Sequence, residues 1–149
     1  MIMKPILGLA AIIAARFWWE VHPGIIPCAA FWTVAISFFG RLWINDRGAL
    51  QVARSIMMLG FLSNAAATLA NGGYMPVLGR SEPSGSVWIP LTEATRLPAL
   101  CDRYAAGASI GDFAIALGMV IGVAIEIMRI VSERPKPGVE ADPCRAASH

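Results

Sequence analysis

The chain has 149 residues, of which 56% are hydrophobic and only 15% are charged. Because charged residues make up about a quarter of an ordinary soluble domain, this composition excludes a soluble globular protein and indicates an integral membrane protein. The formal net charge is only +2 and the basic residues are scattered along the chain, so nucleic acid is excluded as a partner.

The first membrane span is expected over residues 5–20, which are apolar except for Arg16 and the final glutamate. Arg16 lies within one turn of an aromatic end that contains Trp18 and Trp19. Its guanidinium can therefore reach the headgroup region, where tryptophans also anchor a helix. The aromatic end favours a retained helix over a cleaved secretory signal, which is the alternative.

The second span is expected over residues 28–44, after a break at residues 20–27 that contains two prolines and a glycine. Trp32 and Trp43 lie toward the two ends of this span. That placement is typical of interfacial anchors, so the sequence predicts a helical hairpin with both of its arms in the membrane.

The third span is expected over residues 50–70. Gly60, Asn64 and Asn71 are spaced by four and seven residues, which places them on one helical face. A buried amide in lipid needs a partner, so this face is predicted to point into protein. The span stops at a motif that forbids further helix, Asn71-Gly72-Gly73-Tyr74-Met75-Pro76.

Residues 71–107 contain only short apolar runs. We expect this segment to form an ordered cap, because a structureless loop of that length is uncommon unless it has a function. Within it, the stretch from Thr92 to Tyr104 can form a short amphipathic surface helix that is interrupted at Pro98.

The fourth span is expected over residues 108–131 and is followed by a polar cytoplasmic tail over residues 132–149. Ser109 is a natural N-cap for this helix, and Asp112 would complement the positive end of the helix dipole. One face carries small residues that allow another backbone to approach closely: Gly107, Gly111, Ala114, Gly118 and Gly122.

The distribution of Lys and Arg predicts the orientation. Assigning the N-terminus, the turn after the second span and the tail to one side collects eight basic residues against four on the other. The positive-inside rule then places both termini in the cytoplasm and the cap on the outer face. The predicted fold is an all-α integral membrane protein of a bacterial cytoplasmic (inner) membrane, with about four transmembrane helices and an ordered outer-face loop between helices three and four.

Three motifs follow one another in the second half of the chain: Asn71-Gly72-Gly73-x-Met75-Pro76, Thr95-Arg96-Leu97-x-x-Leu100-x-Asp102 and Ser109-Ile110-Gly111-Asp112. With these motifs, roughly residues 50–122 resemble a bacterial membrane-protein family catalogued as domain of unknown function 5317. The resemblance implies a fold in which the three motifs meet at the outer face. It supplies no reaction, and it implies that Asp102 and Asp112 bond exposed backbone N–H groups or Arg96.

Two interpretations of these polar residues remain open. Asn64, Asn71, Arg96, Asp102 and Asp112 can form a site for an ion or small anion at the helix ends. The more ordinary interpretation, which we prefer, is that the carboxylate and the amides complete helix caps and satisfy helix ends.

Cofactor binding has one candidate residue. His22 lies close to Trp18 and Trp19 and can be an axial ligand for a haem or a chlorophyll-type pigment. The alternative is a solvated histidine in the turn beside Pro23. No cofactor is required by the sequence, although bound lipid is expected.

The cysteines allow one disulfide and suggest no metal site. Cys28 and Cys101 both fall on the predicted outer side, where an oxidising compartment would permit a bond between them. Two free thiols are the alternative, and we prefer it. Neither a CxxC motif nor a His/Cys pair at ligand spacing occurs.

The sequence contains no recognisable nucleophile-base pair or phosphate loop, so we do not expect an enzyme. We expect a non-catalytic accessory subunit that packs against a larger respiratory or photosynthetic membrane complex and stabilises its assembly. Its partners would be membrane lipid and other membrane subunits. The alternative is a small carrier or ion-binding protein that uses the region of Asn64, Asn71 and Asp112.

Overall fold

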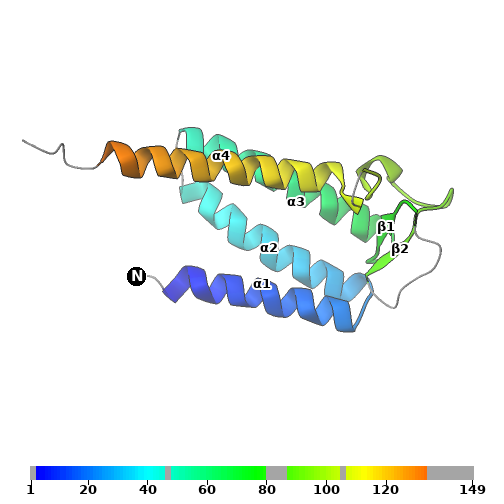
Figure 1. The fold of residues 1–149 in the computed structure, drawn as a ribbon. Coiled ribbons are helices and arrows are strands. Elements are labelled where there is room, and N and C mark those ends of the chain that lie inside the picture. Colours follow the sequence, from blue (N-terminus) through cyan, green and yellow to red (C-terminus); the bar gives the residue numbers. More distant parts are fainter. Residues whose placement is uncertain (1–2, 46–47, 80–86, 105–106, 134–149) are drawn as a thin grey trace, which may run out of the picture.

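The computed structural model of the chain describes residues 3–45, 48–79, 87–104 and 107–133. The α-helices in these residues are α1 (Met3–Val21), α2 (Ile25–Asn45), α3 (Ala49–Ala70) and α4 (Ile110–Ser132). They run up and down beside one another, and the connection between α3 and α4 lies at the end of the bundle where α1 turns into α2 (Figure 1). We call this the cap end.

Three of these helices are long and apolar enough to cross a membrane, namely α2, α3 and α4. The sequence of α1 contains Lys4, Arg16 and Glu20, and the last two form a salt bridge of 2.8 Å across one turn. The structure thus confirms an all-α, multi-pass membrane protein with four helices. The second helix begins before Pro27 rather than after it, because a proline in the first turn removes no helical hydrogen bond.

The cap segment, residues 71–107, contains a small parallel sheet that the sequence analysis did not predict. Strand β1 (Met75–Val77) pairs with β2 (Trp88–Pro90), and Met75 lies opposite Trp88. Pro76 lies within β1, and its ring favours an extended backbone over a helical one at the preceding residue, Met75.

The predicted amphipathic helix between Thr92 and Tyr104 is wrong. This stretch holds only the 3-10 turn η1 (Pro98–Leu100), entered through Leu97 in the left-handed conformation at φ 51°. Beyond η1 the backbone extends along β1, with the main chain of Asp102 bridging to Val77. Pairing with the sheet therefore replaces the helix that the apolar pattern suggested.

The core at the cap end is aromatic. Trp19 and Trp32 are only 3% and 7% exposed, and they pack with Phe31, Phe61 and Trp88. This corrects the expectation that both tryptophans anchor the bundle at the membrane surface. A buried indole needs a hydrogen-bond acceptor. Trp19 donates to the carbonyl oxygen of residue 73 at 2.8 Å, and Trp32 donates to the hydroxyl of residue 68 at 2.8 Å.

The two remaining predicted anchors lie on the surface of the bundle. Trp18 and Trp43 both have exposed side chains. The indole of Trp43 donates to the hydroxyl of Ser55 at 2.9 Å, which ties α2 to α3 near the end opposite the cap.

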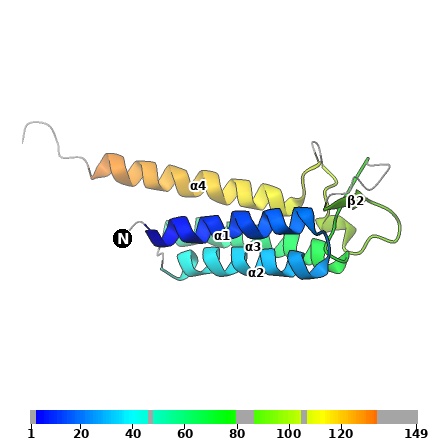
Figure 2. The ribbon, with the colours of Figure 1, turned by 90° about the horizontal axis from the view of Figure 1, so that it is seen from below.

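The contact between α3 and α4 is tightest at the cap end. A Cβ atom on Gly60 would lie 2.5 Å from the carbonyl oxygen of Gly111, and one on Gly118 would lie 2.6 Å from the carbonyl oxygen of Ala53. At Gly122 the nearest atoms are 3.9 Å away. Figure 2 shows the same trend, since α4 tilts away from the other helices toward its C-terminal end.

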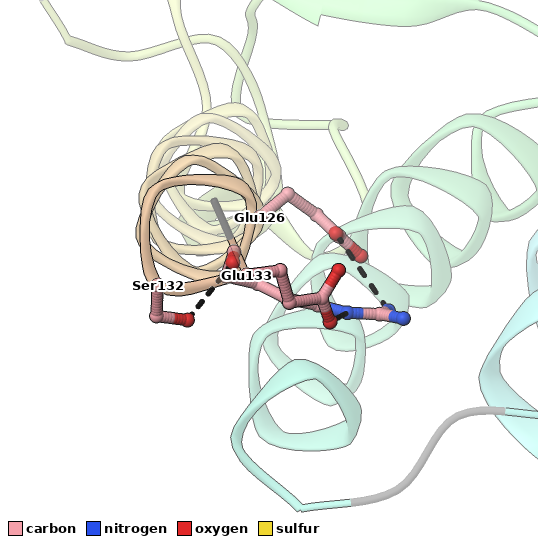
Figure 3. A network of polar contacts seen from close by, with 4 residues as sticks. Glu126, Ser132 and Glu133 are labelled. Carbon is pink, nitrogen blue, oxygen red and sulfur yellow. Dashed lines mark hydrogen bonds and ion pairs between the residues drawn. The ribbon is translucent and has the colours of Figure 1, made fainter. Parts of the chain in front are cut away.

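The last turn of α4 is polar. The Arg129 side chain donates to Glu133 at 2.9 Å and lies 4.0 Å from Glu126, and the hydroxyl of Ser132 donates to the carbonyl of residue 129 at 2.9 Å (Figure 3). Exposed pairs of this kind contribute little to the stability of a helix, because water and salt screen their charges. They mark the end of the apolar span. The predicted tail from residue 134 onward lies outside the described residues.

Candidate ligand-binding site beneath the cap segment

Asn71 fastens the cap segment to the end of α3. Its side-chain nitrogen donates to the carbonyl oxygens of Ala67 at 2.7 Å and of Arg96 at 2.9 Å. Its side-chain oxygen accepts from the backbone N–H of Arg96 at 2.9 Å. Asn71 therefore satisfies a helix end and pairs with one residue of the cap as a neighbouring strand would. Arg96 contributes its backbone to this contact.

The two glycines after Asn71 give the chain its sharp turn. Gly72 and Gly73 have φ angles of 73° and 93°, which favour glycine. A Cβ atom on Gly73 would also collide with the backbone of Gly24 in the turn between α1 and α2. The motif thus brings the start of the cap segment against the first helical hairpin, and the indole of Trp19 bonds to its backbone.

Asp102 is held by β1 through its main chain. Its N–H donates to the carbonyl of Pro76 at 3.1 Å, and its carbonyl accepts from the N–H of Leu78 at 2.9 Å. The residue is only 5% exposed, and its Oδ1 atom has no hydrogen-bond partner among the described residues. The expectation that the Asp102 carboxylate bonds backbone N–H groups or Arg96 is therefore not met at Oδ1.

Asp112, in contrast, is bonded on both oxygens. Ser109 and Asp112 form a capping box, in which the Asp112 N–H donates to the Ser109 hydroxyl at 3.0 Å and the Ser109 N–H donates to Oδ2 at 2.9 Å. The predicted N-cap is confirmed. Asn64 of α3 joins the box by donating to Oδ1 at 2.7 Å and accepting from the Ser109 hydroxyl at 2.8 Å. This network locks the start of α4 onto α3.

Gly111 makes that network possible. A Cβ atom at this position would overlap the Asn64 side chain and lie 2.8 Å from the carbonyl oxygen of Gly60. Only a glycine lets the two helices approach this closely. The small-residue face predicted for the fourth span therefore packs within the molecule, at least at Gly111 and Gly118, which are both buried.

A cavity of about 260 Å³ lies beneath the cap segment, and both carboxylates line it. We call it the cap cavity. Asp102 enters its lining from the cap segment, Asp112 from α4 and Arg16 from α1. Aromatic rings make up much of the remaining wall: Trp19, Phe31, Trp32 and Trp88.

The cap cavity has two electrostatically distinct parts. Burial, followed by the nearby charge of Asp112, raises the pKa of Asp102 from 3.8 to about 7. Arg16 carries the opposite charge, and its guanidinium lies 4.7 Å from the ring centre of Trp19 and 5.5 Å from that of Trp88. Stacking on these rings stabilises the cation and fixes its position.

The described residues contain no group of three or more His, Cys, Asp or Glu side chains that could hold a metal ion. His22 is exposed beyond the end of α1 and does not line the cap cavity. The backbone N–H of His22 donates to the carbonyl of Trp18 at 2.9 Å. A role for His22 in binding a haem or pigment stays a hypothesis.

Cys28 and Cys101 are free and buried, so the structure does not contain the disulfide considered above. Cys28 belongs to the aromatic core, whereas Cys101 packs with Ala67 and Met75. Burial, together with the neighbouring charge of Asp102, raises the pKa of the Cys101 thiol. Its thiol donates to the carbonyl of Leu97 at 3.4 Å.

The structure brings the predicted site residues together in three places. Asn64, Ser109, Gly111 and Asp112 meet where α4 begins, Asn71 meets Arg96, and Asp102 shares the cap cavity with Asp112. Sequence reasoning missed Arg16 as a cavity residue. The available signal was an arginine within an apolar span, which we interpreted as reaching toward the headgroups instead.

The fold and the cavity define a multi-pass membrane protein whose four helices are closed at one end by a cap segment over a polar and aromatic cavity. A family profile described as "Family of unknown function (DUF5317)" matches residues 6–124, which is most of the chain. The protein belongs to this family. The match covers α1 and α2 as well as the region that showed the resemblance. Neither a curated protein nor a solved structure matches the chain.

Proposed function

We propose that the protein binds a small ligand in the cap cavity and that Asp102 receives a positively charged or hydrogen-bond-donating group of that ligand. This develops the carrier or ion-binding alternative of the sequence analysis, in which Asp102 and Asp112 were already candidate site residues. The observation that carries it is the Asp102 carboxylate, which is 5% exposed and has an oxygen without a partner among the described residues.

The cost of leaving the Asp102 oxygen unpaired favours a ligand that carries a hydrogen-bond donor. A buried acceptor left without a hydrogen bond costs about 1–3 kcal/mol, and more when it is charged. Native proteins keep such groups for a reason, often an ion, water or ligand that binds there. A ligand ammonium group would supply both the missing hydrogen bond and a compensating charge.

The walls of the cap cavity suit the same ligand. Asp112 is held rigidly by Asn64 and Ser109, so its charge stays in place at no further entropic cost. The rings of Trp32 and Trp88 also line the cavity, and aromatic faces attract cations. Among the described residues that line the cavity only two are carboxylates, which favours an organic cation over a divalent metal ion.

The binding proposal is tested with ethanolamine as an ammonium probe, added to the full chain in lipid nanodiscs. Tryptophan fluorescence is the readout because three tryptophans line the cavity. We expect saturable binding to the wild type and a loss of about tenfold or more in affinity for Asp102→Asn. Glu133→Gln, at the far exposed end of α4, is the matched control. Equal binding by wild type and Asp102→Asn would rule the proposal out.

We further propose that the cap segment faces the outside of a bacterial cytoplasmic membrane, with both termini in the cytoplasm, as the positive-inside count suggests. Arg103 is exposed in the cap segment. In intact cells, an Arg103→Cys variant that also carries Cys144→Ser, which removes the thiol of the tail, should react with a membrane-impermeant thiol reagent. Labelling only after the cells are opened would reverse the orientation.

A second candidate is the non-catalytic accessory subunit. It is supported by the low burial of α4. Only 6% of the most apolar 18-residue stretch of this helix is buried within the molecule. A groove of about 350 Å³ between α2, α3 and α4 is lined by Leu42, Leu50 and Val123 among others. Deletion of the protein should then weaken a respiratory or photosynthetic complex on native gels. Intact complexes in the deletion strain would speak against this role.

A further inference from the structure

We infer that the ligand of the cap cavity is zwitterionic, with its ammonium end at Asp102 and Asp112 and an anionic oxygen group at Arg16. This inference rests on the proposed function and names the ligand class. It is carried by the presence in one cavity of two carboxylates and one guanidinium that do not pair with each other.

The charged groups reach the cavity from different elements of the fold. Arg16 comes from α1, Asp102 from the cap segment and Asp112 from α4. The described ion pairs include Arg16 with Glu20 but join Arg16 to neither aspartate. Opposite charges in one small cavity attract each other strongly when water is excluded. Because Arg16 and the two aspartates do not pair directly, a molecule with one charge of each sign would bridge them.

Arg16 retains the capacity to bind an anion. A guanidinium has five N–H donors in a planar fork, and the salt bridge to Glu20 is formed by one terminal nitrogen at 2.8 Å. The rings of Trp19, Phe31 and Trp88 lie 4.7, 5.9 and 5.5 Å from the guanidinium carbon. Rings stack on a guanidinium face and leave its donors available at the edge. A planar fork of this kind suits phosphate and carboxylate oxygens.

The volume of the cavity limits the ligand. At about 260 Å³, it is smaller than the roughly 300–1,000 Å³ of pockets that hold drug-sized molecules. A compact zwitterion such as phosphoethanolamine has the required groups a few bonds apart. The same chemistry occurs free in water and as the headgroup of phosphatidylethanolamine, so both sources must be tested.

The decisive experiment compares matched probes on the full chain in nanodiscs of phosphatidylglycerol, with tryptophan fluorescence as the readout. The probes are ethanolamine, O-phosphoethanolamine and ethyl phosphate. We expect O-phosphoethanolamine to bind about tenfold more tightly than ethanolamine, a gain equal to one charge-assisted contact. Arg16→Gln should remove this gain and leave the affinity for ethanolamine within about twofold, whereas Asp102→Asn should weaken both amines.

Two further variants keep the result interpretable. Arg129→Gln changes an exposed arginine far from the cavity and should alter nothing. If Arg16→Gln does not fold, Arg16→Lys retains the charge without the planar fork and should keep only part of the gain. Repeating the titration in phosphatidylethanolamine nanodiscs identifies the source. Weaker binding of the soluble probe there means that the lipid headgroup competes for the cavity, and unchanged binding means a soluble ligand.

The possible failures are distinguishable. If ethanolamine and O-phosphoethanolamine bind the wild type equally well, the zwitterion inference is overturned and the proposed cation site stands. If neither amine binds in phosphatidylglycerol nanodiscs, the proposed function itself fails. If ethyl phosphate binds as tightly as O-phosphoethanolamine and Asp102→Asn has no effect, the cavity is an anion site and both are wrong.

Discussion

Two aspartates that line the same cavity have opposite surroundings. Asp112 accepts hydrogen bonds from Asn64 and from the backbone of Ser109, and it belongs to the contact that joins α3 to α4. Asp102 is more deeply buried, yet its Oδ1 has no partner among the described residues. The fold thus holds the Asp112 carboxylate in a fixed position, whereas the Asp102 carboxylate keeps an oxygen that a ligand can bond.

The largest expected effect comes from removing the satisfied carboxylate. Asp112→Ala removes the carboxylate of the capping box and leaves the side-chain N–H of Asn64 and the backbone N–H of Ser109 without their acceptors. We expect the free energy of unfolding to fall by about 3 kcal/mol. Thermal unfolding in detergent measures it, with Asp102→Ala as the comparison. A larger loss for Asp102→Ala than for Asp112→Ala would reverse the roles assigned to the two groups.

The next prediction concerns how closely α3 and α4 must approach each other at Gly111. Gly111→Ala places a methyl group against the Asn64 side chain, so it should cost about 1–3 kcal/mol of stability. Gly122→Ala is the matched control, because its new methyl group would meet nothing closer than 3.9 Å. We expect that variant to stay within about 0.5 kcal/mol of the wild type. Similar unfolding midpoints for the two variants would mean that the contact between α3 and α4 is looser than described.

The pH dependence of the free energy of unfolding also tests the contrast between Asp102 and Asp112. Because the pKa of Asp102 rises from 3.8 in an ordinary environment to about 7 in the folded protein, the folded state holds a proton that the unfolded state releases. Stability should therefore fall as the pH rises from about 4 to about 7. The charged or titratable groups near Asp102 are Asp112, Cys101, Arg103 and, across the cavity, Arg16.

Asp102→Asn should remove this part of the pH dependence. The asparagine has no charge to bury, so the variant should match the wild type near pH 4 and be more stable than it near pH 8. Urea unfolding at several pH values provides the measurement. Parallel pH curves for the two proteins would show that Asp102 titrates normally and is not held in a buried environment.

Much of this architecture could be predicted from sequence. The apolar runs gave the helices, and the motif at Asn71 gave the end of α3, because both depend on local composition and on backbone conformations that only certain residues allow. The N-cap at Ser109 follows from the same local logic. The membrane class follows from how few residues are charged.

The cap cavity could not be predicted, because it depends on contacts between residues far apart in the chain. Trp19 looked like an interfacial anchor, yet it is buried because the backbone of Gly73 accepts its N–H from 54 residues away. Asp102 faces the cavity only because its main chain pairs with β1. Neither pairing leaves a periodic pattern in the sequence, and the short strands are too brief to show alternation.

The most direct test of the account is the pKa of Asp102 measured with and without an ammonium probe, by the pH titration of its carboxyl carbon in NMR. We expect a value near 7 for the protein alone. Saturating ethanolamine should lower it, because a bound cation favours the ionised carboxylate. An Asp102 pKa that stays the same when ethanolamine is present at saturation would contradict the claim that this carboxylate is the ligand-binding group.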